Sequence, residues 1–239
     1  MRSRMFSFVT KTWNPVVGCM HNCVYCWARQ LANTKLRETE RYRNGFTPQL
    51  IKKELNVTFR NGDFVFVCDM GDLFGNWVPS DWIYKVLNVI GALKFTDFLL
   101  LTKNPQRYMS YPIPTNCILG ATIESDQNYQ SVSDAPLQFD RLYFMLKLAE
   151  AKRHKLFISI EPILDFNLEL FANMLIRIRP WAVAIGYDNY GCGLPEPSLA
   201  KTMKLIEKLE NANITVYRKT LREKTAVKRL EKVTNVEAA

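Results

Sequence analysis

The chain has 239 residues, enough for one substantial hydrophobic core, and we expect a single domain over residues 1–239. No apolar stretch is long enough to cross a membrane, and the N-terminus lacks the pattern of a secretory signal, so we expect a cytoplasmic protein with reduced cysteines. The net charge of +9 favours a polyanionic or phosphorylated partner, although the densest basic stretch, 217–232, has the lysine–glutamate spacing of a solvated helix face.

Apolar, β-rich runs alternate with helical patterns along the chain. The predicted strands are 5–10, 63–69, 96–103, 117–125, 155–162, 181–188 and 214–220. Most are nearly continuous apolar runs, which is typical of strands that are covered on both faces. The clearest helical patterns cover 80–93, 135–153 and 196–213, with Ser80 expected as an N-cap and Pro197 in a first turn.

This alternation predicts parallel βαβ units, arranged either as an open doubly wound sheet or as a closed or partial barrel. Polar groups follow at least five of the predicted strands. An open sheet uses mainly the strand ends near one switch point, whereas a barrel brings all of its strand ends together at one mouth. The distribution of polar residues therefore favours an α/β barrel.

Three of the six cysteines, Cys19, Cys23 and Cys26, lie within eight residues of each other. A structural zinc site needs four ligands and a disulfide needs two. A four-iron cluster held by three cysteines leaves one iron open to bind a small molecule. One alternative is a zinc site with a fourth ligand elsewhere in the chain. His21 is an awkward candidate for that ligand because it lies inside the loop. The other alternative is that the close spacing of the three cysteines is a coincidence.

The spacing Cys-x-x-x-Cys-x-x-Cys, with Tyr25 before the last cysteine, resembles the signature loop of the radical S-adenosylmethionine (SAM) superfamily. The stretches TWNPVVGC, YCWAR, DMGDLFGNW, LTKNP, ATIES, SIEPIL and GYDNY resemble a family of phage, archaeal and bacterial radical SAM proteins that is distantly similar to spore photoproduct lyase. The resemblance covers about residues 10–222. It implies a partial (β/α)6 TIM-like barrel of parallel strands, a [4Fe-4S] cluster and SAM.

The resemblance also implies roles. Cys19, Cys23 and Cys26 would bind the cluster, and Tyr25 would pack beside the cluster and the adenine, with core packing as its alternative. Electron transfer from the reduced cluster would cleave SAM to methionine and a 5′-deoxyadenosyl radical, which abstracts a hydrogen atom from a substrate.

Residues after the second and third predicted strands are candidates for binding SAM. Asp69 or Asp72 could accept a hydrogen bond from the SAM amino group, and Gly71 would let the backbone approach closely, although Asp and Gly also form turns and caps. Lys103 could pair with the SAM carboxylate or could extend into solvent.

Later strand ends supply further candidates. Glu124 and Ser125 could bind ribose hydroxyls or the amino-acid part of SAM. Glu161 closes an apolar run at the predicted barrel mouth and is a ligand candidate. Tyr187 and Asn189 could recognise adenine or the substrate.

The three scattered cysteines have different predictions. Cys68 and Cys117 lie in apolar stretches and are expected to be buried. Cys192 lies between two glycines and could return a hydrogen atom to a product radical. The alternative is an incidental loop cysteine, since no thiol-activating neighbour is evident.

Three functional hypotheses follow. The first is a radical SAM enzyme that acts on a nucleotide or nucleic acid, and the second is one that acts on a small metabolite or a peptide. The third is a noncatalytic nucleic-acid-binding protein with a structural metal. Either enzyme would need a reducing electron donor such as a flavodoxin or ferredoxin.

Overall fold

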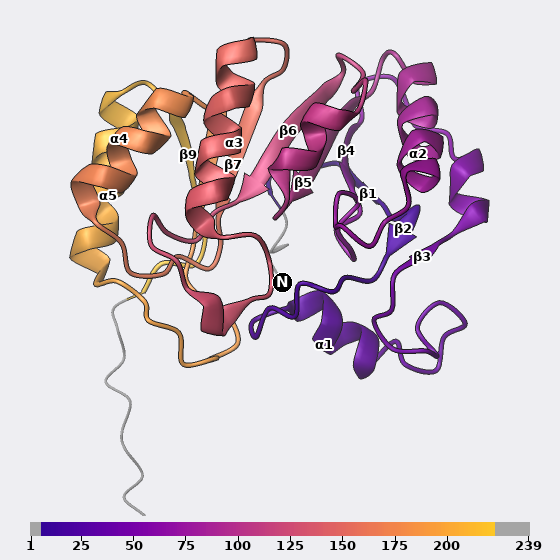
Figure 1. The fold of residues 1–239 in the computed structure, drawn as a ribbon, viewed down its shortest axis with the longest axis horizontal. Helices are drawn as coiled ribbons and strands as arrows, with labels where there is room; N and C mark the ends of the chain where they lie inside the picture. Colours follow the sequence, from indigo (N-terminus) through magenta and orange to yellow (C-terminus); the bar gives the residue numbers. More distant parts are fainter. Residues whose placement is uncertain (1–5, 223–239) are drawn as a thin grey trace, which may run out of the picture.

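The computed structural model describes residues 6–222, and its centre is one sheet of parallel strands (Figure 1). The strand order is β1-β4-β5-β6-β7-β8-β9, so the strands of this sheet follow one another in chain order. They are β1 (Lys11–Trp13), β4 (Phe64–Val67), β5 (Asp97–Thr102), β6 (Cys117–Thr122), β7 (Leu156–Ile160), β8 (Ala182–Ile185) and β9 (Thr215–Arg218). The sheet curls into a half-barrel, which confirms the predicted partial parallel barrel.

Helices cover the outer face of the sheet. They are α2 (Ser80–Ala92), α3 (Gln138–Ala151), α4 (Leu168–Ile178) and α5 (Leu199–Asn211), spread along the sheet in Figure 1. Outward-facing strand residues such as Leu100, Ile158 and Val183 are fully buried in one core with the apolar faces of these helices. Since the inner face is buried as well, the prediction of strands covered on both faces is confirmed.

Aromatic rings from the N-terminal segment fill the inside of the half-barrel. Phe6 lies with its ring 4.9 Å from that of Phe157, and Phe8 lies 5.1 Å from Trp181. The prediction of a strand over 5–10 is therefore wrong for its described residues, and the first strand of the sheet is β1. The alternating aromatic residues of this segment are covered because their rings insert into the concave face of the sheet.

The helix starts also differ from the predicted ones. Ser80 is the first residue of α2 and the N-cap is Pro79, so the predicted N-cap is wrong by one residue. The Ser80 hydroxyl pairs with the Tyr111 hydroxyl at 2.9 Å and caps no backbone amide. At α5 the N-cap is Ser198, which accepts a hydrogen bond from the Lys201 amide, and Pro197 precedes it. The sequence did not predict α4. Of the basic stretch 217–232, the part beyond residue 222 lies outside the described residues.

Smaller elements surround residues 18–26, which carry Cys19, Cys23 and Cys26 and are called the cysteine segment from here on. They are the antiparallel pair β2 (Val16–Val17) and β3 (Gln49–Leu50), helix α1 (Trp27–Asn33), and the 3-10 helices η1 (Lys52–Asn56), η2 (Pro105–Ser110) and η3 (Gln130–Val132). Helix α1 lies beyond one end of the sheet in Figure 1. None of the described helices has the length and apolarity that crossing a membrane requires.

Candidate functional site

A cavity of about 540 Å³ lies at the carboxyl ends of the strands, where parallel barrels place their chemistry. Its wall includes residues that closely follow strands: Lys103 directly after β5, Glu161 directly after β7, and Asp69 and Tyr187 one residue further beyond the ends of β4 and β8. The volume is in the range of small-molecule sites. The convergence of strand ends that the sequence predicted is therefore present.

The three close cysteines line this cavity together, and all three thiols are free. The His21 amide donates to Cys19 Sγ at 3.5 Å, and the Arg29 amide donates to Cys26 Sγ at 3.3 Å. Cys26 is also the N-cap of α1. Backbone donors aimed at sulfur stabilise the thiolate form, which is the form that binds metal.

The donor set fits a four-iron cluster with three protein ligands. Burial raises the pKa of the Cys19 thiol, and nearby Asp72 raises it further, so cluster binding at this thiol would release a proton. Among the described residues no three His, Cys, Asp or Glu side chains form a group suited to one metal ion. A cuboidal cluster does not need three ligands that converge on one ion, because each cysteine binds a different iron of the cluster.

Two glycines set the backbone that leads into the cysteines. Gly18 and Gly71 form an isolated parallel bridge, and the Gly18 amide donates to the Met70 carbonyl at 2.9 Å. Gly18 has a φ of +82°, and a Cβ there would lie 2.3 Å from the Thr47 carbonyl oxygen. A Cβ on Gly71 would lie 3.1 Å from the Gly18 carbonyl oxygen. A close backbone approach was expected at Gly71. It is present, and it brings the cysteine segment against the loop that follows β4.

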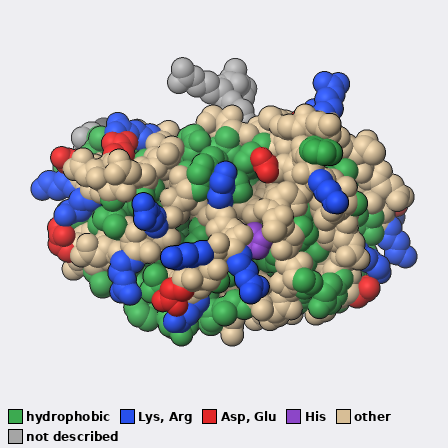
Figure 2. Space-filling model, turned by 90° about the horizontal axis from the view of Figure 1, so that it is seen from above, with side chains coloured by type: hydrophobic (Ala, Val, Ile, Leu, Met, Phe, Trp, Pro, Cys, Tyr) green, Lys and Arg blue, Asp and Glu red, His purple; other side chains and the backbone are tan. Residues whose placement is uncertain are grey.

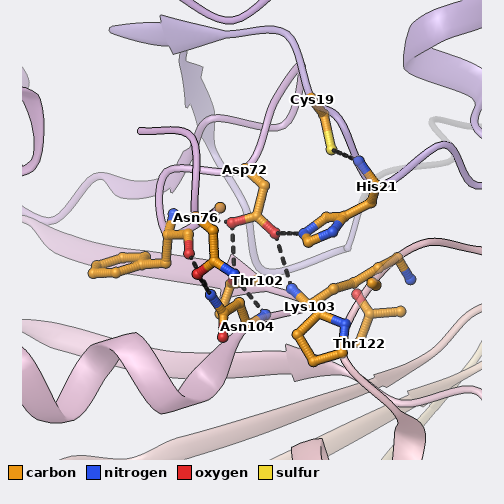
Figure 3. Close-up of polar contacts among 12 residues, drawn as sticks. Cys19, His21, Asp72, Asn76, Thr102, Lys103, Asn104 and Thr122 are labelled. Carbon is orange, nitrogen blue, oxygen red and sulfur yellow. Dashed lines mark hydrogen bonds and ion pairs between the residues drawn. The ribbon is translucent and has the colours of Figure 1, made fainter. Parts of the chain in front are cut away.

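Asp72 joins the cysteine segment to the end of β5 (Figure 3). One carboxylate oxygen accepts from His21 Nε2 and from the Lys103 amide, both at 2.9 Å. The other accepts from the Thr102 hydroxyl at 2.7 Å and from the Phe74 amide at 2.9 Å. Burial alone would raise the pKa of Asp72, but these hydrogen bonds hold the pKa below its usual value.

Glu124 forms the centre of a second buried network. It is fully buried and receives Lys103 Nζ at 2.6 Å, Arg141 Nη1 at 2.8 Å and the Tyr25 hydroxyl. Lys103 Nζ also donates to the Tyr25 hydroxyl at 2.8 Å. Burial disfavours the Glu124 carboxylate, yet Arg141 and Lys103 lower the pKa of Glu124 to about 2. The network therefore holds one carboxylate between two cations, and Lys103 and Tyr25 face the cavity from it.

The remaining strand-end carboxylates differ in their partners. Asp69 lines the cavity and accepts from Asn14 Nδ2 at 2.6 Å, while burial raises the pKa of this carboxyl. Glu161 lines the cavity from the end of β7, and no described residue donates a hydrogen bond to it. Burial raises the pKa of Glu161 to about 7, against the lowering effect of Lys219.

The loop after β8 borders the cavity only in part. Tyr187, Asp188, Asn189 and Tyr190 line it, whereas Cys192 does not. The Cys192 amide donates to Asp188 at 2.6 Å, and burial followed by Asp188 raises the pKa of the Cys192 thiol. The role of Cys192 in hydrogen-atom transfer stays a prediction.

Two further predicted residues lie behind the wall rather than on it. Glu124 reaches the cavity through Lys103 and Tyr25. Ser125 is fully buried, and its hydroxyl donates to the Asp165 carbonyl at 2.6 Å. Cys68 and Cys117 are each 2% exposed, which confirms that they are buried, although Cys68 also borders the cavity.

Sequence reasoning missed Arg141 and the pairing of His21. Arg141 is 1% exposed and lies on the buried face of α3 with Leu142 and Met145. A charged residue among apolar positions of a helical pattern was the available signal. The His21–Asp72 pair joins residues that are 51 positions apart, so local pattern does not indicate it.

A family model described as "Protein of unknown function (DUF5131)" matches residues 3–186. No curated protein matches the chain. A cysteine-to-serine mutant of spore photoproduct lyase shares 11% identity over 90% of this chain and 78% of that chain, with a TM-score of 0.60. A mutant of the same lyase with bound AdoMet and dinucleoside spore photoproduct shares 14% identity over 87% of this chain and 64% of that chain, with a TM-score of 0.53.

A radical SAM methyltransferase from Sphaerobacter thermophilus is also similar, with 12% identity over 90% of this chain and 67% of that chain and a TM-score of 0.52. At these identities the likeness concerns the fold. It agrees with the partial parallel barrel that the sequence motifs predicted.

Proposed function

We propose that this chain, which belongs to the family described as "Protein of unknown function (DUF5131)", is a radical SAM enzyme with one [4Fe-4S] cluster. The observation that carries the proposal is that three closely spaced free cysteines line one cavity with the ends of β4, β5 and β7. When held by Cys19, Cys23 and Cys26, the reduced cluster would supply the electron for cleavage of SAM, and the resulting radical chemistry would remove a hydrogen atom from the substrate. We extend the proposal to residues 1–239 as one radical SAM domain.

The cysteine segment would hold three of the four irons through Cys19, Cys23 and Cys26, leaving one iron for SAM. His21 lies between the first two cysteines and is fixed by its bond to the buried Asp72. Asp72 in turn binds the Lys103 amide and the Thr102 hydroxyl at the end of β5. These contacts tie the cysteine segment to the sheet and so orient it before any cofactor binds.

The Glu124 network would bind the amino-acid part of SAM. Arg141 and Lys103 together carry two positive charges against the one negative charge of Glu124, which leaves an excess of one positive charge. Lys103 faces the cavity and is the cation within reach of a ligand carboxylate. Asp69, beside Gly71, is the matching acceptor for the SAM amino group.

For the substrate, we favour a nucleotide or a nucleic acid. Aromatic side chains contribute much of the cavity wall, and bases stack on such rings: Phe46, Phe66, Tyr25, Trp27, Tyr187 and Tyr190. The net charge of +9 and the similarity to a lyase with a bound dinucleoside point the same way. A small metabolite or a peptide is the alternative, and a flavodoxin or ferredoxin would supply the electron.

The test is anaerobic reconstitution with iron and sulfide, followed by measurement of iron content and of 5′-deoxyadenosine formed from SAM and a chemical reductant. We expect cluster absorbance and SAM cleavage from the native chain. Cys23→Ala should lose bound iron and lower SAM cleavage by at least about a hundredfold, since one missing ligand of three opens a second iron.

Cys117→Ala is the matched control, because Cys117 is also buried but does not line the cavity. It should keep the native iron content. Failure of the iron-loaded native chain to cleave SAM, with or without nucleosides or single-stranded DNA present, would overturn the proposal. Equal iron content in Cys23→Ala and native protein would also overturn it.

A further inference from the structure

The three residues of the cysteine segment that would bind iron differ in the groups that contact their sulfur atoms. Cys19 and Cys26 each accept a hydrogen bond from a backbone amide, at 3.5 Å and 3.3 Å, and that amide lies two or three positions later in the chain. Among the described residues the polar partner of Cys23 Sγ is instead the Ser133 hydroxyl, at 3.2 Å. The middle cysteine therefore takes its partner from a segment that is 110 residues away.

Backbone contacts hold Ser133 opposite the cysteine segment. Ser133 directly follows η3 in the loop between β6 and α3, and it is buried. On one side of it the Val132 carbonyl accepts from the Val24 amide at 3.0 Å, and on the other side the Asp134 amide donates to the His21 carbonyl at 2.7 Å. These hydrogen bonds do not use the Ser133 side chain. The loop would therefore stay in place beside the cysteines if the hydroxyl were removed.

The hydrogen of the Ser133 hydroxyl has two acceptors within reach. Ser133 Oγ accepts from the Ala135 amide at 3.1 Å, and it lies 3.1 Å from the His21 carbonyl oxygen and 3.2 Å from Cys23 Sγ. While Cys23 is a thiol, it can donate to Ser133 Oγ, and the hydroxyl can donate to His21. A cysteine binds iron as a thiolate, which has no hydrogen to donate, so the contact then requires Ser133 as the donor. The His21 carbonyl keeps the Asp134 amide as its donor in that case.

We propose that Ser133 tunes the cluster: its hydroxyl donates a hydrogen bond to Cys23 Sγ when Cys23 binds iron, and this bond raises the reduction potential of the cluster. The proposal rests on the proposed function, since it concerns the same three cysteines. One-electron reduction adds a negative charge to a cluster and its thiolate ligands, so a donor at sulfur stabilises the reduced form more than the oxidised form.

The surroundings of this pair strengthen the effect. Cys23 and Ser133 are each 9% exposed, so water has little access to replace a missing donor. Ser133 is not part of the cavity wall, whereas Cys23 is. Ser133 is thus a positioning residue that acts through Cys23, and the property that it controls is a potential.

The test is a redox titration of the reconstituted protein without SAM, in which stepwise chemical reduction is followed by electron paramagnetic resonance. Ser133→Ala should keep the native iron content and have a lower midpoint potential. We expect about a tenfold fall in the ratio of reduced to oxidised protein at a given potential, or about 59 mV for a one-electron couple. Ser133→Thr keeps the hydroxyl and should stay within about twofold of the native ratio.

Ser198→Ala is the matched control for the loss of a serine hydroxyl. Ser198 caps α5 by accepting from the Lys201 amide at 3.2 Å, and it does not line the cavity. Its replacement weakens a helix start and has no contact with the three cysteines. We therefore expect a less stable protein with the native midpoint potential, which separates a change of potential from a general loss of stability.

An unchanged midpoint potential in Ser133→Ala would overturn the proposal, and so would a shift of equal size in Ser198→Ala or in Ser133→Thr. Loss of the cluster from Ser133→Ala would overturn it as well, because the hydroxyl would then hold the cysteine segment rather than tune a bound cluster. A native chain that holds no four-iron cluster would fail both proposals. Because the potential is measured without SAM, a chain that shows the expected shift but does not cleave SAM would fail only the proposed function.

Discussion

On the β4–β6 side of the cavity the carboxylates accept hydrogen bonds from several protein groups, whereas on the β7 side Glu161 accepts none from the described residues. On the first side Asp72 and Glu124 are buried, ionised and fully occupied, so they fix the positions of His21, Lys103 and Tyr25. On the other side the Glu161 carboxylate faces the cavity without a hydrogen-bond donor among the described residues. The difference separates carboxylates that fix the positions of their neighbours from one that is open to the cavity.

The largest expected effect comes from breaking the Glu124 network. Glu124→Leu leaves Arg141, 1% exposed, with its charge uncompensated in the interior. We expect a loss of about 3–5 kcal/mol in the free energy of unfolding, measured by urea denaturation. Because the pKa of Glu124 is lowered to about 2, the stabilising effect of this carboxylate is present above pH 4.5 and is lost as the pH falls toward 2.

The matched variant is the double substitution Glu124→Leu with Arg141→Leu. Removing both charges leaves no unpaired ion between α3 and the sheet, so the double variant should be more stable than the sum of the two single losses predicts. Lys103 keeps its place near the solvent side of the network, at 12% side-chain exposure. Additive losses in the three variants would contradict the assignment of Glu124 and Arg141 as one coupled unit.

A smaller loss is expected at Asp72. In Asp72→Asn one oxygen becomes an amide that cannot accept from the Lys103 amide or from His21. We expect a loss of about 2 kcal/mol in the free energy of unfolding, because buried donors are left without an acceptor. Asp134→Asn is the control, since Asp134 accepts from Asn22 at an exposed position. Equal losses in the two variants would show that the Asp72 contacts do not fix the cysteine segment.

Much of this arrangement could be predicted from the sequence, because parallel strands bring residues at their carboxyl ends together. The apolar runs before Asp69, Lys103 and Glu161 located three strand ends correctly, and all three residues line the cavity. Nothing local indicated what each side chain would contact. The partners of Asp72 and Glu124 come from the cysteine segment and from α3, so they follow from packing alone.

The N-terminal segment shows the limit of periodicity. Alternating apolar residues over 5–10 predict a strand, but Phe6 and Phe8 face one another in a stacked pair 5.5 Å apart and fill the half-barrel. A sheet with a concave face needs side chains to fill it, and residues outside the strands can supply them. Ser125 gives a similar lesson, since its hydroxyl is used within the fold by the Asp165 carbonyl.

The smallest expected effect concerns the acceptor on the β7 side, through its pH dependence. Burial raises the pKa of Glu161 to about 7, so the folded chain holds the proton more tightly than the unfolded chain does. The resulting stability is fully present below pH 4.5 and is lost as the pH rises through 7, while Lys219 on the loop after β9 limits the loss. Glu161→Gln lacks this titration. Its melting temperature relative to native should therefore rise between pH 5 and pH 8, by the equivalent of about 1–2 kcal/mol. A constant difference across that range would mean that the Glu161 carboxylate already has a partner in the free protein.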